Sequence, residues 1–173
     1  MAHVYLLDAM MIGKLADSRP DPEVDATTRR FREHLHAIGD AKVIICAITV
    51  GEAEFGLRIV SGMDDGKREA VRRTLTAFSE VFSIDRATAI LFGEVRAALF
   101  DKHAPLVSRN ARRKIKWVED LVDRTSAKSL GVQENDVWLA AVALQYNLVL
   151  VSDDRMTRIK EAWPKLHFVN WLE

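Results

Sequence analysis

The chain has 173 residues, with 25 lysines and arginines against 25 aspartates and glutamates, so its formal net charge is zero. This balance excludes a wholly basic nucleic-acid-binding surface but not a local basic patch. A hydrophobic fraction of 49% allows one domain, residues 1–173, to form a full core, and a single cysteine, Cys46, excludes an internal disulfide bond.

Targeting signals are not evident in the sequence. The N-terminus lacks a charged start followed by an apolar stretch and a cleavage site, and no apolar run approaches the ~20 residues that cross a bilayer. We therefore expect a soluble, cytoplasmic protein with no membrane partner, in which Cys46 is a small buried core residue.

The first half of the sequence predicts short strands that alternate with helices. Continuous apolar, β-branched runs are typical of strands buried on both faces, and apolar residues at helical spacing indicate the helices. In chain order the predicted elements are a strand at Val4–Leu7, a helix at about 22–38, a strand at Val43–Ile48, a helix at Thr49–Val60, a polar loop at 61–66 and a helix at about 67–79.

The second half continues the alternation around an alanine-rich helix. In chain order it predicts a helix capped by Asp85, a charged helix at Ser108–Lys128, the alanine-rich helix at Val137–Tyr146, a strand at Leu148–Val151, a helix ending near Trp163 and a closing strand at His167–Trp171. Strands alternating with helices predict an α/β fold with a mainly parallel central sheet.

Four acidic residues stand at the junctions of these elements. Asp8 follows the first strand, Glu52 lies in the first turn of the next helix, Asp136 opens the alanine-rich helix and Asp154 follows the third predicted strand. Ligands of open α/β sheets bind beyond the carboxyl ends of the strands, so these acids are expected to converge. Such a cluster needs a cation, and oxygen ligands favour Mg²⁺ or Mn²⁺ over structural zinc.

Each acid also has a purely structural interpretation. Thr49 and Glu52 fit a capping box, Asp136 and Asp154 fit the first turn of a helix, and Asp8 could cap a helix that begins directly after it. Asp8 is the hardest to explain in this way, because it interrupts an apolar stretch in which an unpaired carboxylate would be costly. The hypothesis of a metal site therefore centres on Asp8.

Taken together, the acidic segments resemble the PIN-domain ribonucleases, most closely the VapC-type toxins of bacterial toxin–antitoxin pairs. The matching segments are Tyr5-Leu6-Leu7-Asp8, the Thr-x-x-Glu-x-x-x-Gly stretch at 49–56, the alanine-rich block that starts at Asp136, Val151-Ser152-Asp153-Asp154 and Val169-Asn170-Trp171. The resemblance implies a PIN-like three-layer α/β/α fold and a divalent-metal-dependent endoribonuclease that hydrolyses RNA phosphodiester bonds with Mg²⁺ or Mn²⁺. It also implies a cognate antitoxin and a homodimer. The chain departs from the family between Leu99 and Gly131, where it is longer.

The resemblance also assigns roles to individual residues. The implied catalytic metal ligands are Asp8, Glu52, Asp136 and Asp154, with Asp153 as an alternative to Asp154. Asp8 and Asp136 would be the core ligands, and the other acids would complete the site directly or through water. Ser152 would orient a carboxylate or the phosphate.

A run of basic residues, together with Arg155 beside Asp154, could bind the phosphate groups of the RNA backbone. The candidate phosphate contacts are Arg109, Arg112, Arg113, Lys114, Lys116 and Arg155. Trp117 follows the run and could stack on an unpaired base. Alternatively, the segment is a solvated helix face balanced by nearby acids, with Trp117 in the core, and the sequence leaves both interpretations open.

Three other functions compete with a toxin nuclease. A Mg²⁺-dependent phosphatase would carry a second aspartate two residues after the first, where this chain has Met10. A non-catalytic PIN-like binding module has no need of all four acids. A stand-alone PIN nuclease outside a toxin pair is the further alternative, which the absence of a small gene directly upstream would favour.

Overall fold

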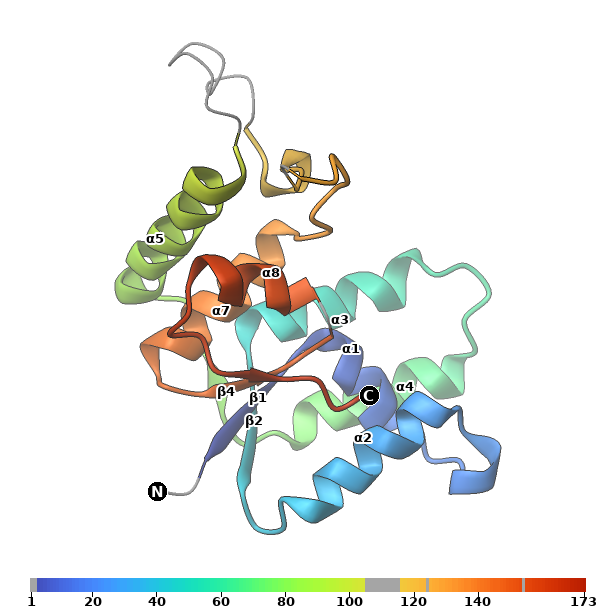
Figure 1. Ribbon diagram of the computed structural model, residues 1–173. Helices are drawn as coiled ribbons and strands as arrows, with labels where there is room; N and C mark the ends of the chain where they lie inside the picture. Colours follow the sequence, from blue (N-terminus) through green and yellow to red (C-terminus); the bar gives the residue numbers. More distant parts are fainter. Residues whose placement is uncertain (1–2, 105–115, 124, 154) are drawn as a thin grey trace.

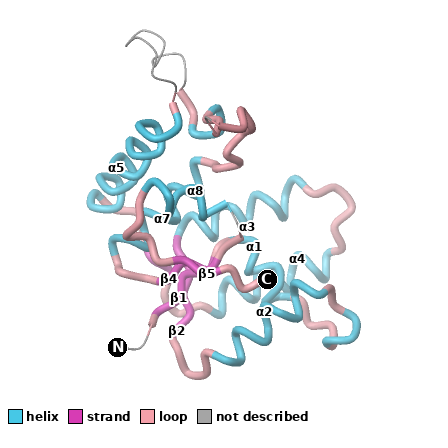
Figure 2. The backbone as a smooth tube through the Cα atoms, viewed as in Figure 1, coloured by secondary structure: helices cyan, strands magenta, loops and turns pink. Residues whose placement is uncertain are grey.

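A five-stranded parallel sheet with the strand order β3-β2-β1-β4-β5 forms the middle of the molecule (Figures 1 and 2). The computed structural model describes residues 3–104, 116–123, 125–153 and 155–173, apart from the side chain of Arg155. The strands are β1 (Val4–Leu7), β2 (Lys42–Cys46), β3 (Val81–Phe82), β4 (Val149–Val151) and β5 (Phe168–Val169).

Helices cover both faces of the sheet. Within the described residues they are α1 (Ala9–Ala16), α2 (Ala26–Ala37), α3 (Ala47–Ile59), α4 (Asp65–Ala77), α5 (Arg86–His103), α7 (Glu134–Gln145) and α8 (Arg155–Ala162). Helices α1, α2 and α4 pack on one face, and α5, α7 and α8 pack on the other (Figure 1). The predicted three-layer α/β/α architecture with a parallel sheet is confirmed. No helix in the described part of the chain is long and apolar enough to cross a membrane.

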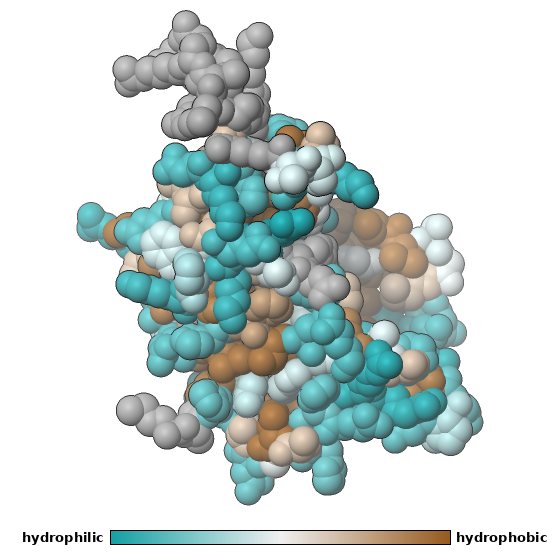
Figure 3. Space-filling view, in the orientation of Figure 1, coloured by the Kyte–Doolittle hydropathy of each residue, from teal (hydrophilic) through white to brown (hydrophobic). Residues whose placement is uncertain are grey.

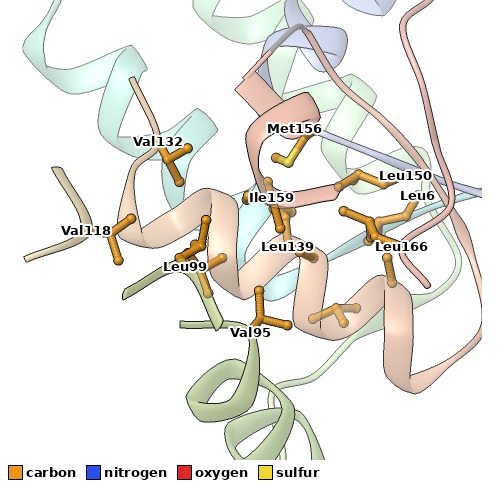
Figure 4. Close-up of a cluster of buried hydrophobic side chains, with 14 of the residues drawn as sticks. Leu6, Val95, Leu99, Val118, Val132, Leu139, Leu150, Met156, Ile159 and Leu166 are labelled. Carbon is orange, nitrogen blue, oxygen red and sulfur yellow. The ribbon is translucent and has the colours of Figure 1, made fainter. Parts of the chain in front are cut away.

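Alternation along the strands sends neighbouring side chains into two separate cores. Leu6 of β1 joins a cluster with Leu99 of α5 and Leu139 of α7, which Figure 4 shows between the helices and the sheet. Leu7 faces the opposite way and joins Met11 of α1 and, from α2, Phe31. Because both faces of each strand are buried, the strands appear in the sequence as continuous apolar runs.

Some predicted boundaries differ from the observed ones, and a helix cap explains one of these differences. The helix predicted from about 22 begins at Ala26, because the Asp25 carboxylate accepts a hydrogen bond from the amide of Thr28 at 2.8 Å. The strand predicted at Val43–Ile48 ends at Cys46, and the next helix begins at once. Asp85 caps α5 as predicted, and Cys46 is buried as predicted. The sequence did not predict β3, which has two residues.

The segment predicted as a charged helix over Ser108–Lys128 is not helical where the structure describes it; residues 105–115 of that prediction lie outside the described part. The described part contains a 3₁₀ turn at Val118–Asp120 and an antiparallel bridge between Val122 and Ser129. The Asp123 carboxylate accepts hydrogen bonds from the amides of Thr125 and Ser126. These local side-chain bonds compete with helical hydrogen bonds, so the charge pattern alone was misleading.

His103, at the end of α5, is buried beside charged groups of α5, α8 and the following loop. Burial lowers the pKa of its imidazole below its usual range, and Lys102 and Arg158 lower it further. Glu161 and Asp123 act in the opposite direction. Among the described residues no atom hydrogen-bonds to its Nε2. The folded protein therefore favours the neutral imidazole.

This burial predicts a loss of stability in mild acid. Because the pKa of His103 is lower in the folded than in the unfolded protein, the unfolded state binds more protons between the two values. The free energy of unfolding should be highest above about pH 6.5 and should fall as the pH drops toward the folded pKa. Denaturant unfolding between pH 5 and 8 measures this; His103→Gln should flatten that part of the curve, and the exposed control His36→Gln should not.

Candidate functional site

Asp8 lies at the carboxyl end of the sheet, directly after β1 and at the N-cap position of α1. Its backbone N–H donates to the carbonyl oxygen of Val151 at 3.1 Å, which extends the pairing of β1 and β4 by one residue. Its side chain makes no capping hydrogen bond with α1; instead, Ser152 Oγ donates to Oδ2 at 2.5 Å. Asp8 as a whole is only 4% exposed. The capping interpretation of Asp8 is therefore wrong.

Asp136 reaches the same end of the sheet from α7. This helix ends just before β4, so its first turn lies toward the carboxyl ends of the strands (Figure 1). Asp136 is the third residue of α7 and is 4% exposed. Its Oδ2 accepts a hydrogen bond from the amide of Gln133 at 2.8 Å. Asp136 therefore acts as the N3 residue of a capping box, as one of its two structural interpretations proposed.

Glu52 is joined to α7 by a hydrogen bond across the site. Asn135 Nδ2 donates to Glu52 Oε1 at 3.0 Å, which links the first turns of α7 to the first half of α3. The predicted capping box of Thr49 and Glu52 is absent, because Cys46 is the N-cap of α3 and Thr49 lies inside the helix. Thr49 Oγ1 donates instead to the carbonyl oxygen of Leu7 at 2.8 Å, so α3 is fixed to the end of β1 beside Asp8.

Three further acids lie near the site in the sequence, and the structure describes two of them. Glu54, the neighbouring glutamate on α3, forms ion pairs with Arg58 and Arg72 and so belongs to a surface network. Asp153 is partly buried directly after Ser152. Asp154, predicted as the fourth ligand, lies outside the described residues.

The carboxylates of the site are suitable ligands for a hard cation, but they are few. Asp8, Glu52 and Asp136 offer only carboxylate oxygens, the ligands that Mg²⁺ and Mn²⁺ prefer. Within the described ranges no three His, Cys, Asp or Glu side chains come together as a metal-binding group. Mg²⁺ usually keeps several waters and binds through one or two protein carboxylates, so two buried aspartates are a sufficient core.

The basic candidates are only partly described. Arg109, Arg112, Arg113 and Lys114 lie outside the described residues, as does the side chain of Arg155. Lys116 is exposed, and its carbonyl oxygen accepts a hydrogen bond from Arg96. Trp117 is 60% exposed, so the interpretation that placed it in the core is wrong.

Asn135 and Thr49 are the two polar residues of the site whose contacts the sequence did not reveal. Asn135 stands directly before Asp136. A side-chain amide next to an acid at a helix start could have suggested a hydrogen-bond donor to a second acid of the site. Thr49 was interpreted as a cap because it follows an apolar run and precedes a glutamate by three residues. Its actual partner, the Leu7 carbonyl, is 42 residues away and leaves no local signal.

Comparisons with known proteins agree with this architecture. The family profile described as PIN domain matches residues 5–162 of the chain. No curated protein matches the sequence significantly. Among solved structures, VapBC2 from Rickettsia felis bound to a DNA fragment from its promoter is 17% identical with a TM-score of 0.60, over 97% of this chain and 98% of that chain.

Two further structures align over nearly their whole length. FitAcB from Neisseria gonorrhoeae is 17% identical with a TM-score of 0.61, over 96% of this chain and 97% of that chain. DNA-bound VapBC from Salmonella typhimurium is 20% identical with a TM-score of 0.58, over 99% of both chains. At these identities the likeness shows a common fold.

Proposed function

Because this chain belongs to the PIN domain family, whose members are generally nucleases, we propose that it is a divalent-metal-dependent endoribonuclease that hydrolyses RNA phosphodiester bonds. One observation carries the proposal: Asp8 and Asp136 are both almost fully buried at the carboxyl end of the sheet. Ligands of open α/β sheets bind in the crevice beyond the carboxyl ends of the strands, which is where these two carboxylates lie. Their oxygen atoms suit Mg²⁺ or Mn²⁺.

Each residue of the site has a distinct part in this proposal. Asp8 and Asp136 would hold the ion, which when bound would supply a nucleophilic water at neutral pH and neutralise charge on the phosphate. Ser152 fixes the orientation of Asp8 through its hydrogen bond to Oδ2. Asn135 holds Glu52 toward α7, where Glu52 would complete the site. Asp154, or Asp153 in its place, would be the fourth acid.

We further propose that the protein is the toxin of a type II toxin–antitoxin pair. VapBC complexes are among the structures with the same fold, and a groove offers room for a partner. It has a volume of about 230 Å³ and lies between α1, α3 and α4. Val60, which lines the groove directly after α3, is exposed and apolar. Phe55 and Ile59 of α3 and Met10 of α1 are also exposed apolar residues, and Figure 3 shows hydrophobic surface over the second half of α3.

An amphipathic helix of an antitoxin would fit this groove, with apolar residues at helical spacing against α1 and α3. A homodimer is part of the same proposal. A neighbouring gene for a small protein would support the toxin role, and its absence would favour a stand-alone PIN nuclease.

The test of the nuclease proposal is cleavage of single-stranded RNA by the purified chain. We expect fragments with Mg²⁺ or Mn²⁺, complete loss of cleavage in EDTA, and recovery when excess Mg²⁺ is returned. Cleavage that persists in EDTA would contradict the metal site. No cleavage with either ion, together with intact RNA binding, would point to a binding module.

A further inference from the structure

Trp117 is held facing solvent by the residue that follows it. Its backbone is extended, with φ −114° and ψ 148°, and consecutive side chains on extended backbone point in opposite directions. The next side chain, Val118, is fully buried in the cluster that contains Leu99 and Val132 (Figure 4). Burial of Val118 therefore turns the Trp117 indole outward.

Hydrogen bonds link residues on both sides of Trp117 to the start of α7. Arg96 of α5 donates to the carbonyl oxygen of Lys116 and, through Nε, to Glu134 Oε1 at 3.0 Å. Glu119 Oε1 accepts a hydrogen bond from the amide of Glu134 at 2.9 Å. Glu134 begins α7, two residues before Asp136. The segment that carries the exposed indole is thus held to the helical turn that carries a candidate metal ligand.

We propose that Trp117 stacks on an unpaired base of the RNA substrate, beside the candidate cleavage site. This inference rests on the proposed nuclease function and deepens it, because it makes single-stranded RNA the substrate class. Bases can stack on a side chain only where they are not paired in a duplex, and an indole offers a large flat surface for them. The neighbouring exposed Lys116 supplies positive charge for the phosphate backbone.

The surroundings of Trp117 favour a base over a protein partner. Protein docking sites are contiguous apolar patches, and this chain exposes apolar residues at the end of α3, in Phe55, Ile59 and the following Val60. Trp117 instead has charged, exposed neighbours, Lys116 and Glu119. An exposed aromatic directly after a lysine suits a base next to its phosphate backbone.

The test is carried out in EDTA, which removes the metal that the proposed cleavage requires, so that binding is measured apart from cleavage. The probe is a mixed-sequence 2′-O-methyl RNA of about 12 nucleotides, used as a single strand and as a duplex with its complement. Stacking on one aromatic changes affinity about tenfold or more. We expect Trp117→Ala to raise the Kd for the single strand by about tenfold, Trp117→Phe to raise it less, and neither to change the Kd for the duplex.

Tryptophan fluorescence gives a second readout. Single-stranded probe should quench the wild-type signal, and Trp117→Phe should remove that quenching. Tyr146→Ala, which removes an exposed aromatic at the opposite end of α7, is the matched control and should bind like the wild type. Far-ultraviolet circular dichroism and the Tm should be unchanged in both Trp117 variants.

Three outcomes would overturn the inference: wild-type affinity of Trp117→Ala for the single strand, an equal loss for single strand and duplex, or a loss that affects only binding of a protein partner. Failure of the nuclease proposal gives a different result. It would appear as metal-independent or absent cleavage, whereas the dependence of single-strand binding on Trp117 would persist.

Discussion

Replacing Asp8 by asparagine should lower metal-dependent RNA cleavage by about a thousandfold while the protein stays folded. A catalytic metal supplies several kcal/mol of transition-state stabilisation, and each 1.36 kcal/mol is a factor of ten in rate. Asparagine keeps the shape of the side chain and an oxygen that can accept the hydrogen bond from Ser152, but it loses the charge that attracts the ion. Single-turnover cleavage of a labelled single-stranded RNA measures the effect.

The control for Asp8→Asn is Asp40→Asn, which removes the same charge from an exposed turn and should leave cleavage unchanged. The Tm of Asp8→Asn should lie within about 4 °C of the wild-type value. If Asp8→Asn cleaves RNA at the wild-type rate, the assignment of Asp8 as a metal ligand is wrong. If cleavage and the Tm fall together, Asp8 has a structural role.

At Asp136 two substitutions should separate metal binding from helix capping. Asp136→Asn should reduce cleavage at least a hundredfold but retain an oxygen that accepts the Gln133 amide. Asp136→Ala should reduce cleavage equally and also lose the capping bond, which costs about 1 kcal/mol and lowers the Tm by about 2–4 °C. Cleavage rates and thermal unfolding of both variants measure the two effects.

Asp64→Ala is the matched control for the capping effect. Asp64 caps α4 through the amide of Lys67 at 3.1 Å, so its loss should lower the Tm by a similar amount without changing cleavage. Wild-type cleavage by Asp136→Asn with reduced cleavage by Asp136→Ala would mean that Asp136 acts only through the helix cap. The metal site would then depend on Asp8 and other acids.

The sequence predicted the central sheet because the strands are buried, and it thereby predicted where the first strand ends at Asp8. The apolar runs before Asp8 and Ser152 are strands whose two faces are covered by helices, and such strands leave a continuous hydrophobic signal. In a parallel sheet their carboxyl ends share one edge. The placement of Asp8 beside Ser152 therefore followed from two local patterns and one rule of topology.

Features that depend on distant partners could not be predicted in this way. Thr49 bonds to the carbonyl of Leu7, and Glu52 to Asn135, across chain separations that no local pattern records. The orientation of Trp117 depends on the burial of Val118 among α5 and α7 side chains, so the sequence left it open. The two residues of β3 are too few to show an alternating pattern.

Both edges of the sheet are unusually short, and this restricts how copies of the chain can associate. An edge strand exposes unpaired backbone groups on which another chain can add a strand, a common route to aggregation. Here the edge strands β3 and β5 have two residues each, and Lys42 pairs with Glu80 at 2.6 Å just before β3. Such edges offer few hydrogen bonds to a neighbouring chain. Copies of the chain should therefore associate through their helices and not by adding strands to the sheet. Such contacts favour dimers over fibres.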